Sequence, residues 1–364
     1  MLVVAGSFGE TVTPTACINA IATAVPSHDV HRAFIQWAEH QLVDMRERAL
    51  FRRMAERSGI GHRWSVLPYA ENGGSPVDPG GFYESASPGT AARMRVYAEE
   101  APRLALRAIA GLGPLGRITH LVVASCTGFV APGIDQIIAA ELGLPGDIER
   151  TLVGFMGCYA AVAALRVAYH IARSEPGARI LVVNVELSSL HLQYEARLEP
   201  LLAMLQFGDG AAAMIVSGEG PGFALERPFA ATLPDSAQLI RWDVGDTGFA
   251  MHLSGEVPGR IAEALRDDAL RAALLSGSAA GDIDSWAVHA GGRSVLDAVE
   301  HGLSLDPDAL ADSRAVLAAF GNMSSATLPF VLSRLLREPD RTHGVALAFG
   351  PGLAAEGFHF RRLR

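Results

Sequence analysis

Near the middle of the chain runs the stretch Arg150-Thr151-Leu152-Val153-Gly154-Phe155-Met156-Gly157-Cys158-Tyr159-Ala160-Ala161. Its first four residues read as a short buried strand, and apolar residues recur at helical spacing from Ala160 to Ile171. The glycines between the two patterns permit a tight approach of the backbone. The stretch therefore predicts a strand that turns abruptly into a helix, with Cys158 at the helix N-terminus.

Strand and helix patterns alternate along much of the chain. Almost wholly apolar strands separated by helices predict a mostly parallel sheet covered on both faces. The run Gln206–Gly210 is echoed by Ala348–Gly352, each a strand-and-glycine pattern, so two related α/β halves are expected, at 1–217 and 218–364. The predicted strands are 18–25, 118–124, 150–153, 179–185, 211–216, 285–288 and 344–349, and the predicted helices are 30–57, 90–110, 134–142, 159–173, 257–275, 293–302, 308–319 and 323–337.

The composition is that of a globular, core-rich protein. Of the 364 residues, 49% are hydrophobic and 19% are charged, which excludes a disordered chain. The formal net charge of -9 argues against a nucleic-acid partner. The sequence also contains no apolar run of the roughly 20 residues that a membrane span requires.

Cysteine usage and the first residues bear on location. The three cysteines, Cys17, Cys126 and Cys158, have wide and unrelated spacings, so neither a disulfide framework nor a metal site is expected. An odd number of cysteines favours reduced thiols and a cytoplasmic setting. The start, Met1–Gly6, lacks the basic flank and the long apolar stretch of a signal peptide.

Three residues together suggest acyl chemistry. Cys158 at a helix start is placed to form a nucleophilic thiolate, although a lone cysteine is more often a buried core residue. His289 ends a strand and precedes Gly291 and Gly292, where open α/β sheets place their ligands; a satisfied core histidine is the alternative. Asn322 precedes a helix, and a helix N-cap is its alternative.

As a set, these three residues are chemically coherent. The imidazole can hold the thiol as a thiolate, so the pKa of Cys158 is expected to fall below about 8.5. Imidazole and carboxamide can also donate hydrogen bonds to a thioester oxygen and stabilise the enolate that malonyl decarboxylation produces. Papain-like proteases share the order Cys, His, Asn, but here all three residues lie at strand ends of an α/β pattern, which argues against a protease.

The motifs around these residues resemble those of the type III polyketide synthases, the chalcone synthase-like family. The resemblance extends from about residue 17 to the C-terminus. It implies a thiolase-like five-layer αβαβα fold, a homodimer, and iterative decarboxylative condensation of malonyl-CoA onto an acyl-CoA starter, with cyclisation to a pyrone, resorcinol or similar polyphenol. No cofactor is expected beyond the CoA thioester substrates, and no metal. The matching runs are 157–158, 207–213, 289–292, 321–325 and 349–352.

The resemblance also assigns roles to residues. Cys158 is the loading nucleophile, and His289 with Asn322 forms the decarboxylation and condensation pair. Arg53 and Arg57 fall where the family places cations for the CoA phosphates, with a solvated helix face as the alternative. The implied substrate-binding residues are Phe207 and Met251 at the gate, Cys126 and Thr127 in the cavity wall, Ser324, and the cyclisation loop Gly350, Pro351 and Gly352.

Some positions depart from the pattern of plant members. Ala290 stands where plant enzymes have Pro, Ala131 replaces a Met that reaches across the dimer, and Trp242 lies near a position that is Gly. A plant-type product such as a chalcone is therefore not expected.

Two other readings remain open from the sequence. A ketoacyl-ACP synthase III-like enzyme, or a chain-joining ketosynthase that fuses two β-ketoacyl chains, shares the Cys–His–Asn set but condenses once. A non-catalytic acyl-CoA-binding protein on the same fold belongs to a different functional class, and the intact set of three residues argues against it.

Overall fold

The computed structural model describes residues 15–84, 88–266 and 268–364. The segment Met1–Gly6, considered above as a possible leader, lies outside the described residues, as do residues 85–87. In the parts of the chain that are described, no helix combines the length and the apolar character that a membrane crossing requires.

Nine strands form the main sheet, in the order β11-β12-β13-β8-β1-β7-β6-β4-β5. The two halves of this sheet meet where β1 pairs with β8 through only two residue pairs, Cys17 with Ala224 and Ile18 with Phe223. The strands are β1 (Cys17–Ala24), β4 (His120–Ser125), β5 (Glu149–Gly154), β6 (Arg179–Leu187), β7 (Asp209–Ser217), β8 (Gly222–Thr232), β11 (Ser285–Val288), β12 (His343–Gly350) and β13 (Ala354–Leu363).

The two halves repeat one strand order. The N-terminal half runs β5-β4-β6-β7-β1, and the C-terminal half runs β11-β12-β13-β8. With its strands numbered along the chain, the N-terminal half has the order 3-2-4-5-1. The described residues of the C-terminal half include no counterpart of strand 3 (β5), so its strands β8, β11, β12 and β13 correspond to strands 1, 2, 4 and 5, and their order is 2-4-5-1. In both halves the fifth strand is antiparallel to the fourth, as β7 is to β6 and β13 is to β12. The expected relation between two α/β halves is therefore confirmed.

The expectation of a mostly parallel sheet is wrong, because among the strands that the structure describes only the pairs β4–β5, β4–β6 and β11–β12 are parallel. The strand expected to be buried, β5, is an exposed edge strand.

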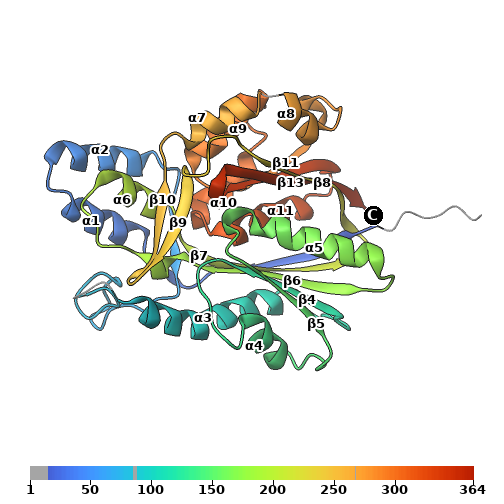
Figure 1. Cartoon of the computed structure of the whole chain (residues 1–364), viewed down its shortest axis with the longest axis horizontal. Helices are drawn as coiled ribbons and strands as arrows, with labels where there is room; N and C mark the ends of the chain where they lie inside the picture. Colours follow the sequence, from blue (N-terminus) through green and yellow to red (C-terminus); the bar gives the residue numbers. More distant parts are fainter. Residues whose placement is uncertain (1–14, 85–87, 267) are drawn as a thin grey trace, which may run out of the picture.

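Helices and sheet form five layers (Figure 1). Helices α5 and α11 lie between the two halves of the sheet, α3 and α4 cover the outer face of one half, and α7 and α9 cover the outer face of the other. Three hydrophobic clusters fill these interfaces, and the central cluster joins alanine-rich α5 to α11. This is the expected thiolase-like αβαβα arrangement. The helices are α3 (Thr90–Ala110), α4 (Ile134–Glu141), α5 (Ala160–Ser174), α7 (Val257–Ala264), α8 (Asp268–Leu275), α9 (Arg293–Leu303), α10 (Ala311–Phe320) and α11 (Thr327–Arg337).

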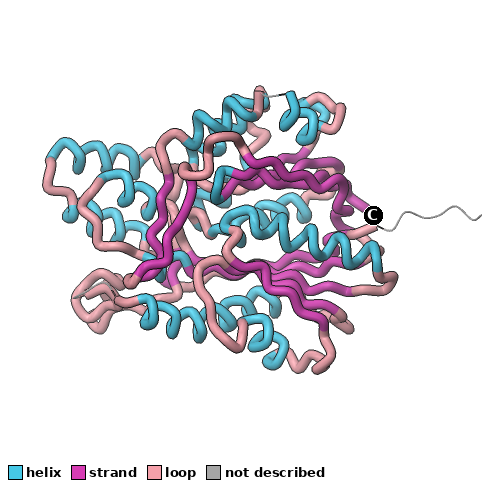
Figure 2. Tube along the Cα trace, in the orientation of Figure 1, coloured by secondary structure: helices cyan, strands magenta, loops and turns pink. Residues whose placement is uncertain are grey.

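The smaller elements cover one side of the layered body. The hairpin of β9 (Ile240–Gly245) and β10 (Gly248–Leu253) forms its own two-stranded sheet and packs against α6 (Leu198–Met204) (Figure 2). Helices α1 (His31–Gln41) and α2 (Met45–Glu56) join α6 in a satellite hydrophobic cluster. A second small sheet pairs β2 (His28–Asp29) with β3 (Trp64–Ser65).

Two helix predictions differ from the structure. The single helix expected over 30–57 is two helices, because the chain leaves helical geometry at Leu42 and Asp44 caps a new start by accepting a hydrogen bond from the Arg46 N–H at 2.7 Å. The stretch 257–275 is likewise divided into α7 and α8. In both stretches the apolar residues keep their helical spacing across the break. The spacing alone therefore does not reveal that the helix is interrupted.

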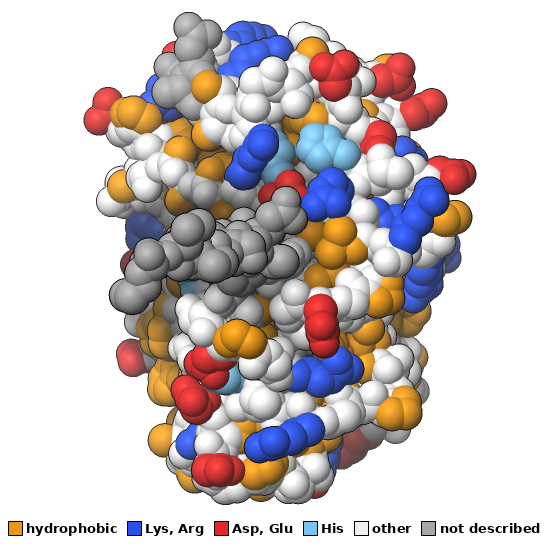
Figure 3. Space-filling view, turned by 90° about the vertical axis from the view of Figure 1, so that its right-hand side faces the viewer, with side chains coloured by type: hydrophobic (Ala, Val, Ile, Leu, Met, Phe, Trp, Pro, Cys, Tyr) orange, Lys and Arg blue, Asp and Glu red, His pale blue; other side chains and the backbone are white. Residues whose placement is uncertain are grey.

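The face toward the C-terminus has mixed charge. In Figure 3, acidic and basic side chains are interspersed over this face, and no continuous basic stripe crosses it. Such a mixed face agrees with the net charge of -9 in arguing against a nucleic-acid surface here.

Candidate active site

Cys158 lies at a sharp turn between a strand and a helix. β5 ends at Gly154, and the 3-10 turn η1 (Gly157–Tyr159) leads into α5. Gly157 has a φ of 72°, and a Cβ on it would lie 2.5 Å from Pro351 Cδ. Only glycine therefore allows Pro351 to approach the turn that carries Cys158. The Cys158 side chain is buried but borders the main cavity.

Asn322 lies before a second 3-10 turn, η4 (Ser324–Ala326), which leads into α11. Its Nδ2 donates to the Gly291 carbonyl at 3.1 Å, and its Oδ1 accepts from the Ser324 N–H at 2.8 Å. Its backbone pairs with the loop of Phe207, because the Asn322 N–H donates to Gln206 O and the Gly208 N–H donates to Asn322 O. The Oδ1 bond closes a local turn and is not a helix cap, because Met323 directly precedes η4 and no side chain caps that turn; the alternative role of Asn322 as an N-cap is therefore wrong. Asn322 also forms a hydrogen bond with the Cys158 side chain, which uses its second Nδ2–H.

His289 follows β11 and is almost fully buried. Its backbone N–H donates to Leu347 O at 2.8 Å, and the Gly291 N–H donates back to His289 O at 2.8 Å. Neither ring nitrogen has a hydrogen-bond partner among the described residues. Gly291 thus links the two residues, because its N–H donates to His289 and its carbonyl accepts from Asn322, while the described part of the chain supplies no partner for the imidazole.

Burial controls the ionisation of both groups. Desolvation raises the pKa of the Cys158 thiol to about 12, against the opposing hydrogen bonds from Ser324 and Asn322. Desolvation also lowers the pKa of His289 to about 3. The structure thus contradicts the expected fall in the Cys158 pKa. Because charging either group in this buried site is costly, neutral thiol and neutral imidazole are favoured over a resting ion pair.

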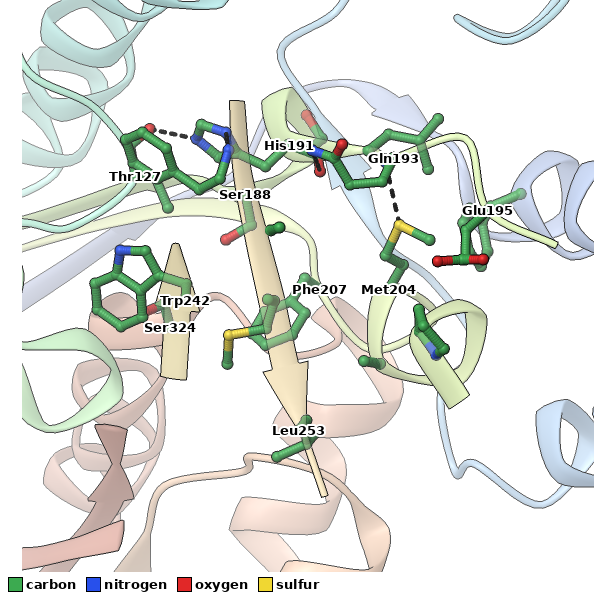
Figure 4. A pocket seen from close by; sticks show the side chains of 18 of the residues that line it. Thr127, Ser188, His191, Gln193, Glu195, Met204, Phe207, Trp242, Leu253 and Ser324 are labelled. Atoms are coloured by element: carbon green, nitrogen blue, oxygen red, sulfur yellow. Dashed lines mark hydrogen bonds between the residues drawn. The ribbon is translucent and has the colours of Figure 1, made fainter. Parts of the chain in front are cut away.

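The cavity in front of Cys158 has a volume of about 430 Å³. It is lined by most of the expected substrate-binding residues, namely Cys126, Thr127, Phe207, Met251, Ser324 and Pro351. Gly350 and Gly352 flank Pro351 outside the lining, and His289 and Asn322 lie outside it as well. Arg53 and Arg57 are exposed on and just after α2 and do not line the cavity. Figure 4 shows Thr127, His191, Phe207 and Trp242 around this space.

Glu186 is a buried carboxylate that the sequence analysis missed. It accepts hydrogen bonds from Cys126 Sγ at 3.2 Å and from Thr127 Oγ1 at 2.8 Å, and also from Ser325 Oγ. Desolvation raises the pKa of Glu186. Ser324 Oγ lies 3.2 Å from Cys126 Sγ, which extends this network toward Cys158. In the sequence, the one feature that could have identified Glu186 is its position as a single acidic residue within the apolar run of β6.

His191 was also missed, and its environment fixes its tautomer. Its Nε2 donates to the Thr127 carbonyl at 2.6 Å, and its Nδ1 accepts from the Phe249 N–H at 3.1 Å (Figure 4 shows the first bond). The ring stacks on Phe249 at 4.1 Å, and burial lowers the pKa of His191 to about 4. A neutral His191 therefore ties the cavity wall to the β9–β10 hairpin.

Comparison with known proteins identifies the family. The family model for the N-terminal domain of chalcone and stilbene synthases matches residues 8–221, and the model for their C-terminal domain matches residues 208–364. The chain belongs to the chalcone and stilbene synthase family. The alpha-pyrone synthesis polyketide synthase-like Pks18 of Mycobacterium tuberculosis is 32% identical over 97% of this chain and 92% of that protein. The Mycobacterium bovis Pks18 gives the same values.

Solved structures agree with this assignment. PKS-I from the brown alga Ectocarpus siliculosus is 29% identical with a TM-score of 0.87, over 98% of this chain and 100% of that one. The C-terminal type III polyketide synthase domain of Steely1 from Dictyostelium is 26% identical with a TM-score of 0.85, over 96% and 100%. This chalcone and stilbene synthase family member is thus a type III polyketide synthase, a condensing enzyme of the acyltransferase class. The matches favour this reading over a ketoacyl-ACP synthase III-like enzyme or a non-catalytic binding protein.

Proposed function

We propose that this type III polyketide synthase loads an acyl group from acyl-CoA onto Cys158 and extends it with malonyl-CoA, using His289 and Asn322 for decarboxylation. The observation that carries the proposal is the buried, unpartnered imidazole of His289. Buried polar atoms in folded proteins nearly always have a partner, so a vacant imidazole in a site of this kind is reserved for a ligand. A thioester carbonyl oxygen is the acceptor that a neutral imidazole N–H would bind.

Loading begins when the Cys158 sulfur attacks the carbonyl carbon of acyl-CoA. The thiol proton leaves to His289, the bond from carbonyl carbon to CoA sulfur breaks, and CoA departs as the thiol once it has taken that proton. The burial that opposes a resting thiolate makes proton transfer part of this step, so the neutral imidazole serves as the general base.

Extension needs an enolate from malonyl-CoA. The bond between the malonyl carboxylate and its α-carbon breaks, carbon dioxide leaves, and the electron pair passes to the thioester oxygen. An N–H of His289 and the Nδ2–H of Asn322 that faces Cys158 would donate to that oxygen. Two such donors supply several kcal/mol of transition-state stabilisation, about 3 kcal/mol each. The enolate carbon then attacks the acyl group on Cys158 and releases the cysteine sulfur.

An α-pyrone is the product we propose first. The support is the similarity to Pks18, which is named for alpha-pyrone synthesis. The test is mass spectrometry of products from a panel of short and long acyl-CoA starters with malonyl-CoA and no carrier protein. We expect masses that correspond to two or more extensions, and a product with a single extension in every reaction would contradict iterative condensation.

Arg53 and Arg57 remain candidates for contacts to the CoA phosphates. Both are exposed and lie on the α2 segment, which packs against the cavity-lining helix α6. Arg197 and Arg241 line the cavity itself and are competing cations for the same phosphates. Each of these four positions therefore needs separate substitution.

A homodimer is proposed from the uncovered edge of the sheet. β5 is an edge strand with exposed side chains, and Leu152, Phe155 and Phe129 each expose about half of their surface there. The rings of Phe129 and Phe155 are 6.4 Å apart, so they form one apolar surface. Exposed apolar edge strands are normally covered, and a second copy of this chain is the occupant proposed.

Sedimentation of Leu152→Arg tests the dimer, with Met45→Arg as the control because Met45 is exposed on α2, away from β5. We expect a monomer for the first variant and a dimer for the second.

Cytoplasmic location and the division into halves 1–217 and 218–364 are also proposals. Three free cysteines support the cytoplasmic location, and the end of β7 at Ser217 supports the division into halves.

A further inference from the structure

A cluster of three potential metal ligands lies away from the cavity. His120 begins β4, Glu149 begins β5, and Glu175 caps the C-terminal end of α5. His120 Nε2 lies 3.7 Å from Glu149 Oε2 and 3.6 Å from Glu175 Oε2. Each ligand atom lies within 4.8 Å of the others. The three side chains therefore converge on one point at the starting edge of two parallel strands.

His120 is the buried member, and no described residue forms a hydrogen bond with its Nε2. The side chain is only 6% exposed, whereas Glu149 and Glu175 are 74% and 53% exposed. Separations of 3.6 and 3.7 Å are too long for hydrogen bonds, which require about 3.2 Å or less. A buried ring nitrogen that faces two carboxylates without bonding to either is an unmet polar group.

The other ring nitrogen is held in the way that suits a metal ligand. Nδ1 lies 2.9 Å from Thr119 Oγ1, which is 3.2 Å from the Arg179 carbonyl and accepts from the Arg179 N–H at 2.9 Å. When Thr119 Oγ1 donates its proton to that carbonyl, it can only accept from Nδ1–H. The proton of His120 is then on Nδ1 and the lone pair is on Nε2. Second-sphere bonds of this kind orient metal-binding histidines.

We propose that His120, Glu149 and Glu175 bind a divalent transition-metal ion, Zn²⁺ before others, with water completing the coordination. Ligand atoms of a tetrahedral zinc site with bonds of about 2.0–2.2 Å are about 3.4 Å apart, close to the separations found here. Two carboxylates balance the charge of the ion, and imidazole with carboxylate suits zinc. Nothing in the cysteine spacing pointed to this site, since its ligands are distant in sequence and none is a cysteine.

The backbone already holds the three ligands in place. His120 and Glu149 are direct neighbours in the β4–β5 ladder, and the Glu175 N–H donates to Ile171 O at 2.9 Å. The site lies at the opposite end of β4 from Ser125 and Cys126, about 17 Å along the strand at about 3.3 Å per residue. The ion would therefore clamp the end of α5 to the sheet and take no part in the condensation.

The test is calorimetric titration of chelator-treated full-length protein with ZnCl₂. We expect one zinc per chain, with an affinity at least about tenfold weaker in Glu149→Gln and in Glu175→Gln. Both glutamates are exposed, so neither variant threatens folding. Glu263→Gln on α7 and His301→Gln on α9 are matched controls, because both side chains are exposed and both helices cover the other half of the sheet. They should bind zinc as the unaltered protein does.

Thermal unfolding and Co²⁺ substitution complete the experiment. Zinc at a hundred times its dissociation constant should raise the unfolding temperature by about 3 °C, and the two variants should lose this rise. Cobalt in this site should give visible absorption without thiolate charge-transfer bands. Absence of saturable binding would overturn the proposal, as would an affinity in both variants equal to that of the unaltered protein. Thiolate bands, which indicate binding at Cys158 or Cys126, would also overturn it.

Discussion

The central helices α5 and α11 hold equivalent places in the two halves, and they begin alike. Each follows a 3-10 turn, η1 or η4, and each turn is preceded or opened by a glycine with positive φ, Gly157 at 72° and Gly321 at 68°. The two turns pack against each other. They differ in the side chains they present, since the first presents a thiol and the second presents a carboxamide. A repeated scaffold thus brings two helix starts together, and the proposed chemistry divides between the different side chains that they carry.

The halves also differ at their outer edges. The N-terminal half has a third strand, β5, whose free edge exposes apolar side chains, whereas the described residues of the C-terminal half supply no counterpart and β11 forms that edge. The N-terminal half therefore has an apolar edge strand that a partner can cover, whereas β11 forms the edge of the C-terminal half. Substitutions at the paired helix starts provide the most direct ways to separate the contributions of the halves.

Removal of the thiol from the first helix start should have the largest effect. Cys158→Ala should lower product formation by more than about 10⁴-fold and abolish acyl loading, because no other thiol lies at a helix start. The measurement is intact-protein mass after incubation with acyl-CoA, together with product yield. Cys17→Ala, at a buried position in β1, serves as the control. A covalent acyl adduct on Cys158→Ala would refute the assignment.

The ionisation of Cys158 should give the next largest effect. With a pKa near 12, the thiolate fraction rises about tenfold per pH unit, so alkylation of Cys158 by iodoacetamide should accelerate about 10³-fold from pH 7 to pH 10. Peptide mass spectrometry would follow Cys158 separately from Cys126 and Cys17. A rate that is already at its plateau below pH 7 would show that the ion pair with His289 overcomes the desolvation of both groups.

Substitution at the second helix start should separate loading from condensation. Asn322→Ala should lower condensation by about 10²–10³-fold while acyl loading on Cys158 persists, because the lost donor acts on the enolate oxygen. In the reciprocal variant, Cys158→Gln, decarboxylation of malonyl-CoA to acetyl-CoA should continue. Labelled carbon dioxide release and acyl-enzyme mass report the two steps. If folded Cys158→Gln releases no carbon dioxide, the division between the two helix starts is wrong.

Buried histidines should make the fold sensitive to acid. The pKa of His191 falls from its ordinary 6.5 to about 4 in the folded state, so the unfolded chain binds a proton first as the pH falls. Stability is therefore complete above pH 6.5 and lost toward pH 4, by about 2–3 kcal/mol at pH 4.5. Urea unfolding at pH 7 and pH 4.5 should show a smaller loss in His191→Gln, and an unchanged loss would contradict this account. The same measurement on a His289 variant would test the buried histidine of the other half, whose pKa is lowered to about 3.

The arginines of α2 should have the smallest effect. Arg53→Gln combined with Arg57→Gln should raise KM for malonyl-CoA by about two- to tenfold and leave kcat unchanged, because exposed ion pairs contribute about 0–1 kcal/mol each. Steady-state kinetics provide the measurement. Arg46→Gln, an exposed position at the start of α2, is the matched control. An unchanged KM would place the phosphates elsewhere, with Arg197 and Arg241 the next candidates.

Local sequence was sufficient where the signal lies within one turn of chain. The strand, glycine and helix pattern around Cys158 predicted a nucleophile at a helix start, and α3 was predicted with its observed bounds, Thr90–Ala110. His289 at a strand end and Asn322 at a helix start were found for the same reason. The breaks between α1 and α2 and between α7 and α8 were missed, because amphipathic spacing continues through a short interruption.

The sequence by itself determined the two related halves and the membership of the family, and it indicated the residue types proposed for the chemistry. Only the tertiary structure decided how those residues are tuned and what surrounds them. Burial raises the pKa of Cys158 and lowers that of His289, and burial depends on every layer packed around the site. The same holds for Glu186 beneath Cys126, and for His120 between Glu149 and Glu175, whose members are distant in sequence. Desolvation and long-range contacts are properties of the packed molecule, so no local pattern encodes them.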